Sequence, residues 1–256
     1  MVHTETGIDH IHRTILGVSF FGGSAIDAVA AIRGGGLLVS PAAPALTDMD
    51  HDVGYRDALL GADIAIADSA LMVMVWNLLQ RDSLKRLSGL TYLRELLLQP
   101  HVRQAGNTLW IMANQKSSET NLKWLAENGI SVHPQYVYMA PIYGAEIADD
   151  DLLALLDRLR PQHVITTIGG GTQERLGLYL KQHLSYRPAI HCIGAAIAFL
   201  SGDQVHIPVW VDKLYLCWLF RCISDPKRYI PRYWGARKLI WLILRYRDRL
   251  PSLRDA

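Results

Sequence analysis

This chain of 256 residues contains little cysteine and no long hydrophobic segment. Its three cysteines, Cys192, Cys217 and Cys222, lack the spacing of a zinc site, and an odd number cannot all pair internally. We therefore expect reduced thiols, as in a cytoplasmic protein. No uncharged apolar stretch reaches the ~18 residues needed to span a bilayer, and the polar N-terminus has no signal-peptide core. These absences predict a cytoplasmic chain that does not cross a membrane.

Basic charge is scarce in most of the chain and concentrated at its end. Residues 1–200 have a formal net charge of −4, whereas residues 201–256 have +6 and hold four of the seven tryptophans. A basic, aromatic-rich segment on a mildly acidic body indicates an anionic partner. A membrane surface suits this composition better than nucleic acid, because no recognised nucleic-acid-binding module precedes the segment.

Short apolar runs alternate with helical patterns through residue 200. Helices are expected over 52–62, 117–129 and 149–161, and strands over 36–40, 62–68, 108–113, 130–134, 163–169 and 189–196. Several strands are apolar on successive residues, as in parallel strands covered on both faces. The pattern predicts an α/β fold, with a Rossmann-like, mostly parallel sheet and helices on both faces.

The C-terminal part is expected to form a separate helical appendage. We place the boundary near residue 202, with an α/β catalytic domain over 1–202 and an appendage over 203–256. Helical pieces are expected at about 209–224, 226–234 and 236–250. The last piece has Leu239, Leu242 and Ile243 on one face and basic residues near both ends, a pattern typical of a helix at a membrane surface.

Polar or small residues follow four of the expected strands. They are Ser40, Asp68, the glycines 169–171 and the segment 193–202. Ligands bind at the carboxyl ends of parallel strands, so these positions should share one cleft. Asp68 could cap the following helix or act as a general base. The glycine triplet could be a phosphate cradle or a tight turn, since it is neither a dinucleotide fingerprint nor a Walker A loop.

The order of these segments resembles the WecG/TagA/CpsF family, glycosyltransferase family 26. "ILGV" from residue 15 resembles the opening strand of the family, and "ADIAIADSALMV" resembles its strand with the catalytic aspartate. Similar matches are "RLSGLT", "TTIGGGTQERL", "CIGAAIAFLSGDQVHIPVWV" and "LYLCWLFRCISDPKRYIPRYW". The resemblance covers nearly the whole chain, from residue 15 to about residue 233.

The resemblance implies an inverting, metal-independent transfer of a sugar from a UDP-sugar to a saccharide on a polyprenyl diphosphate. N-acetylmannosamine, its uronic acid and glucose are all donors used in the family. The enzyme would work without a cofactor on the inner face of the cell membrane, in cell-surface polysaccharide synthesis, and could form a homo-oligomer. The resemblance also implies that Asp68 is the catalytic base, that Ser40 lies near the acceptor and that Gln173 contacts the active-site pocket. Implied substrate-binding residues are Arg86, Arg221, Arg228, Arg232, Gly169, Gly170, Gly171, Gly194, Ala195 and Phe199.

Several positions depart from the family pattern. Ala42, Ser69, Thr91 and Cys217 replace its Asn, Gly, Asp and Glu, and Gly171-Thr172 replaces Pro-Lys. These changes leave open a non-catalytic, nucleotide-binding subunit of a polysaccharide assembly at the membrane surface. An unrelated α/β enzyme, such as a nicotinamide-dependent oxidoreductase, is the third hypothesis, although the dinucleotide fingerprint is missing. The acidic run Asp48-x-Asp50-x-Asp52 lies at an expected helix start, away from the cleft, so no metal site is expected.

Overall fold

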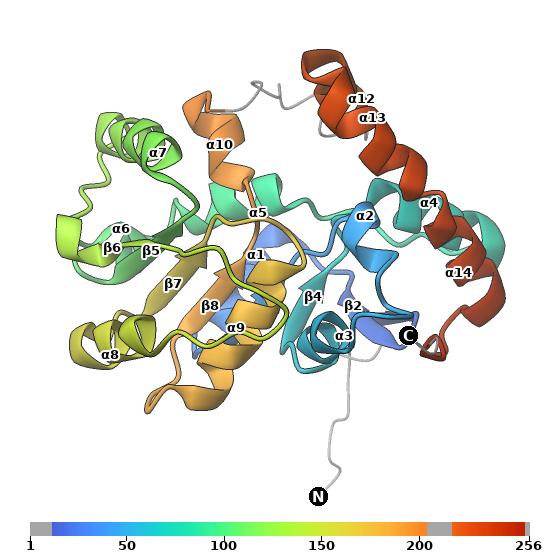
Figure 1. Cartoon of the computed structure of the whole chain (residues 1–256), viewed down its shortest axis with the longest axis horizontal. Helices are drawn as coiled ribbons and strands as arrows, with labels where there is room; N and C mark the ends of the chain where they lie inside the picture. The colour runs from blue at the N-terminus through green and yellow to red at the C-terminus, as the bar shows by residue number, and fades with distance from the viewer. Residues whose placement is uncertain (1–11, 204–216, 254–256) are drawn as a thin grey trace, which may run out of the picture.

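The computed structural model describes residues 12–203 and 217–253. In these residues it contains an eight-stranded sheet of order β1-β2-β4-β3-β8-β7-β5-β6 (Figure 1). Only β1 and β2 pair in antiparallel fashion. The strands are β1 (His12–Ile15), β2 (Val18–Phe21), β3 (Gly36–Val39), β4 (Ile64–Ile66), β5 (Thr108–Met112), β6 (Val137–Met139), β7 (His163–Thr166) and β8 (Ala189–Cys192).

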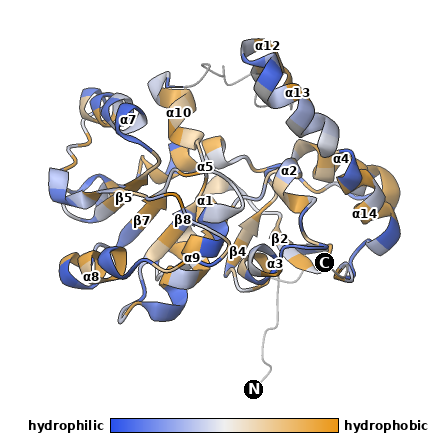
Figure 2. Ribbon diagram, in the orientation of Figure 1, coloured by the Kyte–Doolittle hydropathy of each residue, from blue (hydrophilic) through white to orange (hydrophobic). Residues whose placement is uncertain are grey.

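Helices cover both faces of the sheet, which confirms the predicted fold class. Along β3, Leu37 and Val39 pack into the core on one face and Leu38 into the core on the other, because successive side chains of a strand alternate. The first core includes residues of α3 (Val53–Leu60), α4 (Ala70–Gln80), α8 (Asp150–Leu159) and α9 (Thr172–His183). The second includes residues of α1 (Ala25–Ile32), α5 (Gly89–Leu96), α6 (Pro100–Arg103), α7 (Gln115–Glu127) and α10 (Ala196–Ser201). In Figure 2, hydrophobic residues occur both in strands of the sheet and in the helices that cover it.

Two of the expected strands differ from the structure. Residues 130–134 do not form a strand. The strand in this region is β6, which lies at the edge of the sheet and follows a 3-10 turn at Pro134–Tyr136. The apolar residues Ile130 and Val132 instead pack in the second core. "ILGV" is not one strand, because a turn at Leu16 and Gly17, both with positive φ, separates β1 from β2.

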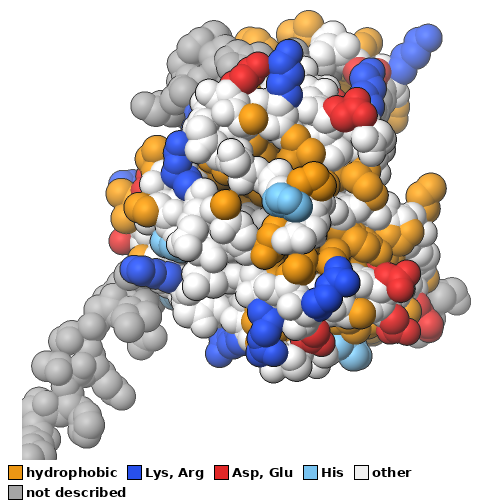
Figure 3. All heavy atoms as spheres, turned by 90° about the vertical axis from the view of Figure 1, so that its left-hand side faces the viewer, with side chains coloured by type: hydrophobic (Ala, Val, Ile, Leu, Met, Phe, Trp, Pro, Cys, Tyr) orange, Lys and Arg blue, Asp and Glu red, His pale blue; other side chains and the backbone are white. Residues whose placement is uncertain are grey.

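The strand β6 forms one edge of the sheet. Met139, the last residue of this strand, is exposed, and Ile142 beyond it is fully exposed. Figure 3 shows apolar side chains gathered on this face of the molecule, among scattered charged ones. No helix in the described residues is both long enough and apolar enough to cross a bilayer.

Of the C-terminal helices, α13 (Pro226–Gly235) and α14 (Lys238–Tyr246) contact α2 (Ala43–Leu46), and α14 also contacts α4 (Figure 1). The helix α12 (Cys217–Ser224) packs on α13. As expected, a new helix begins at Pro226, where the Tyr229 N–H donates to the Asp225 carbonyl. Pro231 lies within α13, which continues to Gly235.

The expectation that the apolar face of α14 meets a membrane is wrong. Leu239, Leu242 and Ile243 are fully buried and belong to the first core, with residues of α4. Below α14, the Leu16 and Gly17 N–H groups donate to the carbonyls of Arg247 and Asp248. An amphipathic pattern fits a protein core as well as a membrane surface, and here it serves the core. Independent folding of residues 1–202 stays a prediction.

Candidate active site

Asp68 follows β4 at the carboxyl edge of the sheet, and Ser69 begins the helix that comes next. The Ser69 hydroxyl accepts a hydrogen bond from the Met72 N–H at 3.2 Å, so Ser69 is the N-cap of α4. The cap therefore does not require the carboxylate of Asp68. The N-terminus of α4 also favours a nearby negative charge. Of the two interpretations of Asp68, the capping role is excluded.

Arg86 holds the Asp68 side chain in place. Its Nε donates to the Asp68 carbonyl at 2.6 Å, and its Nη2 donates to Oδ1 at 3.0 Å. The Arg86 side chain is 10% exposed and that of Asp68 is 23% exposed, so solvent weakens this ion pair only partly. The two contacts fix the carboxylate at the mouth of a cavity, where it can accept a proton from a hydroxyl group.

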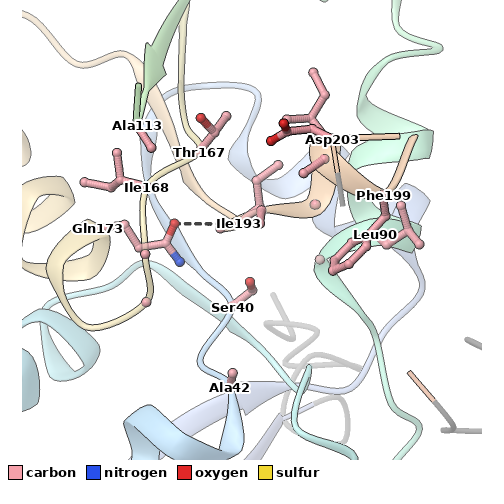
Figure 4. Close-up of a pocket in the computed structure, with 18 of the residues that line it drawn as sticks. Ser40, Ala42, Leu90, Ala113, Thr167, Ile168, Gln173, Ile193, Phe199 and Asp203 are labelled. Atoms are coloured by element: carbon pink, nitrogen blue, oxygen red, sulfur yellow. Dashed lines mark hydrogen bonds between the residues drawn. The ribbon is translucent and has the colours of Figure 1, made fainter. Parts of the chain in front are cut away.

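A cavity of about 420 Å³ opens at the carboxyl ends of the strands. The close-up in Figure 4 shows Ser40 between Gln173 and Ala42 on its wall, with Phe199 on the opposite side. The N-terminus of α5 also faces it through Ser88 and Gly89. Of the residues implied by the resemblance, the cavity is lined by Ser40, Asp68, Arg86, Gly169, Gly170, Gln173, Gly194, Ala195 and Phe199.

The buried Gln173 side chain ties together the loops that form the cavity floor. Its Oε1 accepts hydrogen bonds from the Gly194 N–H at 2.7 Å and from the Thr166 hydroxyl at 3.2 Å. Its Nε2 donates to Glu174 at 3.0 Å. All three contacts are within the protein, so Gln173 shapes the site by positioning the Gly194 turn. The dashed line in Figure 4 marks this link.

Glu174 is a buried acid that the sequence did not single out. Its carboxylate accepts from the Gly171 N–H at 2.6 Å and from Gln173. Burial raises the pKa of Glu174 to about 7, although these hydrogen bonds act in the opposite direction. The amide of Gly171 is therefore occupied within the loop, and Gly171 does not line the cavity. Gly169 and Gly170 remain as the phosphate-cradle candidates.

Polar residues at the end of β5 also line the cavity, although the sequence did not single them out. Asn114 caps α7 by accepting from the Ser117 N–H, and it lines the cavity with Lys116. Lys116 contributes an exposed ammonium group to the rim, which suits an anionic ligand. Opposite, Asp203 accepts from the Ser117 hydroxyl at 2.7 Å. The signal was present, because these residues directly follow an apolar strand.

A second cavity, of about 300 Å³, adjoins the first. Asp68 and Arg86 line both cavities, while Trp218 and Tyr233 from the C-terminal helices line the second. Tyr229 of α13 reaches the first cavity. The helix α13 thus lines both cavities, and α12 lines the second. These helices carry three arginines implied in substrate binding, whose side chains lie outside the described residues: Arg221, Arg228 and Arg232.

The acidic run at residues 48–52 has structural roles. Asp50 is buried and accepts from Lys238 of α14 at 2.6 Å and pairs with His51. Asp52 caps α3 by accepting from the Tyr55 N–H at 2.8 Å. The described residues contain no group of three or more histidines, cysteines or acids that could hold a metal ion. The acids of this run instead connect α14 to the body and start α3.

Two comparisons with known proteins bear on this site. Residues 13–252 match the profile of the glycosyl transferase WecG/TagA/CpsF family. The chain is also 23% identical over 188 residues to N-acetylglucosaminyldiphosphoundecaprenol N-acetyl-beta-D-mannosaminyltransferase of Bacillus subtilis (strain 168), with 71% of each chain covered. The family match spans the sheet, both cavities and all three C-terminal helices.

Proposed function

This chain belongs to the WecG/TagA/CpsF family of glycosyl transferases, and we propose that it transfers a sugar from a UDP-sugar to a saccharide carried on a polyprenyl diphosphate. The relative from Bacillus subtilis is named for the transfer of N-acetylmannosamine to such an acceptor. That sugar is therefore the first donor to test; its uronic acid and glucose are the next. The observation that carries the proposal is Asp68, held by Arg86 where the polar and apolar cavities meet.

The proposed reaction is a single displacement with inversion. Asp68 accepts the proton of the acceptor hydroxyl as the oxygen attacks the anomeric carbon. The bond from that carbon to the diphosphate breaks, and its electron pair leaves with UDP. The loop at Gly169 and Gly170 and the ammonium of Lys116 face the cavity where this charge develops.

The three arginines of α12 and α13 are proposed to complete the site, without a metal, by closing over the diphosphate. In support, Arg228 directly precedes Tyr229 in α13, and Tyr229 lines the first cavity. Cations that arrive with a closing segment stabilise the leaving group and exclude water in one step. Closure on an anionic membrane would couple catalysis to the presence of the lipid acceptor.

We further propose that the protein binds peripherally to the inner face of the cell membrane. The outer faces of the C-terminal helices expose Trp234, Trp241 and Leu244, with Arg237 stacked on Trp234 and Arg245 on Trp241. Tryptophan and arginine side chains suit the headgroup region of an anionic bilayer. Self-association remains a prediction, which analytical ultracentrifugation tests.

The test is a screen of radiolabelled UDP-sugars on a short-chain polyprenyl-diphosphate acceptor, with the wild type and Asp68→Asn. The amide cannot take the proton, so we expect transfer to fall by about 10²–10⁴-fold while UDP binding by calorimetry is retained. Asp57→Asn, a change at an exposed position on α3, is the matched control and should transfer normally. Undiminished transfer by Asp68→Asn would refute the base assignment. UDP binding without transfer to any acceptor would favour the non-catalytic subunit.

A further inference from the structure

The second cavity is an apolar groove that the proposed chemistry does not use. Its wall is formed by α2, the first two turns of α4 and two aromatic side chains of the C-terminal helices. It is lined by Ala42, Ala43, Pro44, Asp68, Ser69, Ala70, Leu71, Met74, Arg86, Trp218, Tyr233 and Ala236. Asp68 and Arg86 are the only charged residues in this set, and both lie where the groove meets the first cavity.

We propose that this groove holds the first isoprenoid units of the acceptor's polyprenyl chain. The assignment rests on the proposed function and adds to it a binding site for the lipid. A saccharide linked to a polyprenyl diphosphate has a polar head and an apolar chain in one molecule. The two cavities reproduce that division, because the first is lined by glycine loops and polar side chains and the second by aliphatic and aromatic ones.

The charge at the junction supports this orientation. With the acceptor sugar at Asp68, the diphosphate that links it to the lipid lies next to the Arg86 guanidinium, a group that binds phosphate well. The chain beyond the diphosphate then enters the groove. A nucleotide diphosphate suits this groove poorly, because beyond the junction the described residues of its wall offer no cation and little hydrogen bonding.

The outer end of the groove is formed by a residue of α4 and a residue of the C-terminal helices. Met74 lines the groove and is 51% exposed, so it lies at the opening. Trp218 faces it from α12 and is also partly exposed. A lipid chain that leaves between these side chains remains in apolar surroundings from Asp68 to the protein surface.

The experiment compares two acceptors with the same saccharide diphosphate, one on an undecaprenyl chain and one on a short alkyl chain, in detergent micelles. The readout is the ratio of kcat/KM for the long chain to kcat/KM for the short chain. Met74→Glu places a charge in the groove, so we expect this ratio to fall by at least about tenfold, which corresponds to about 1.4 kcal/mol. Met74→Leu preserves the apolar volume of the side chain, so this variant should have the same ratio as the wild type.

Leu78→Glu is the matched control. Leu78 lies one helical turn further along α4, is 82% exposed and does not line the groove. The same charge at this position should leave the ratio as in the wild type. An unchanged ratio in Met74→Glu, or an equal fall in both glutamate variants, would overturn the groove assignment alone. If the wild type transfers sugar to neither acceptor, the proposed function fails, and the groove assignment fails with it.

Discussion

After β4, the adjacent residues Asp68 and Ser69 have separate roles: Ser69 caps the next helix, and Asp68 faces the cavities. Ser69 satisfies the first turn of α4, and Asp68 is left to face the cavities with Arg86 as its partner. The family pattern has glycine at the position of Ser69, and a glycine cannot offer a side-chain cap. The substitution therefore adds a helix cap and leaves the carboxylate in place, so it favours an intact base.

Gln173 supplies the first prediction at this scale. In Gln173→Leu, the Gly194 N–H and the Glu174 carboxylate lose a partner. Leaving such buried groups unsatisfied costs about 1–3 kcal/mol, so we expect the free energy of unfolding to fall by that amount and UDP affinity to weaken. Urea unfolding and calorimetry measure the two effects. Gln182→Leu, at an exposed position of the same helix, should change neither; equal losses in both variants would contradict the positioning role.

The sequence predicted residues of the cavity best where they follow an apolar strand or match a family segment. Ser40, Asp68 and Gly194 are in that group, and all line the cavity. The resemblance also named Arg86 and Gln173, but the sequence did not indicate which residues they contact. The contacts of Arg86 with Asp68 join positions 18 residues apart, and Gln173 meets Gly194 across 21 residues. Such contacts depend on how the strands are ordered in the sheet.

At the scale of elements, α14 separates two kinds of apolar residue on one helix. Leu242 is fully buried against the body, whereas its neighbour Trp241 is 44% exposed. We expect Leu242→Ala to lower the free energy of unfolding by about 2–5 kcal/mol, because it leaves a cavity in the core. Trp241→Ala should change stability little and weaken sedimentation with anionic vesicles.

The two α14 variants give opposite results if the assignment of faces is correct. Binding of the wild type to vesicles should also weaken as salt is added, since screening reduces attraction between basic side chains and anionic lipid. A Trp241→Ala variant that binds vesicles as well as the wild type at every salt concentration would remove the outer face of α14 from the membrane contact. A stable Leu242→Ala variant would instead contradict the packing of its inner face.

The elements that the sequence missed are those fixed by distant contacts. The turn between β1 and β2 includes Leu16 at φ 52°, a conformation that few side chains favour. Carbonyl groups of Arg247 and Asp248 accept from the two turn amides, so the C-terminus stabilises what the local sequence does not indicate. The strands predicted from consecutive apolar residues, such as β3, β5 and β8, were found because burial on both faces leaves a local pattern.

At the scale of the whole molecule, a row of three histidines, two of them buried, links neighbouring elements of the fold. His163 Nδ1 lies 3.1 Å from His191 Nε2, and the Tyr92 hydroxyl lies 2.9 Å from His191 Nδ1. The rings of His101 and His163 are 5.0 Å apart. Burial lowers the pKa of His163 to about 4 and that of His191 well below its ordinary value, with the neighbouring histidines acting in the same direction. The three histidines lie in separate segments of the chain, so no local sequence pattern predicts that they meet.

The histidine row predicts a loss of stability in weak acid. The unfolded chain takes up protons near the ordinary histidine pKa of 6.5, whereas folded His163 does so only near 4. The contribution of His163 to stability is therefore complete above pH 6.5 and is lost as the pH drops toward 4, which amounts to roughly 3 kcal/mol. Glu174, with its pKa raised to about 7, acts in the opposite sense, because its buried neutral form is favoured below that pH. Two deeply buried histidines outweigh this single acid.

Urea unfolding at pH 7 and at pH 5 measures the difference, and we expect a lower free energy of unfolding at pH 5. His163→Gln removes one of the buried bases, so it should reduce the dependence on pH even though it lowers stability at pH 7. His133→Gln, at an exposed position, should leave the dependence unchanged. Equal stability of the wild type at both pH values would contradict the prediction that the buried histidines outweigh Glu174.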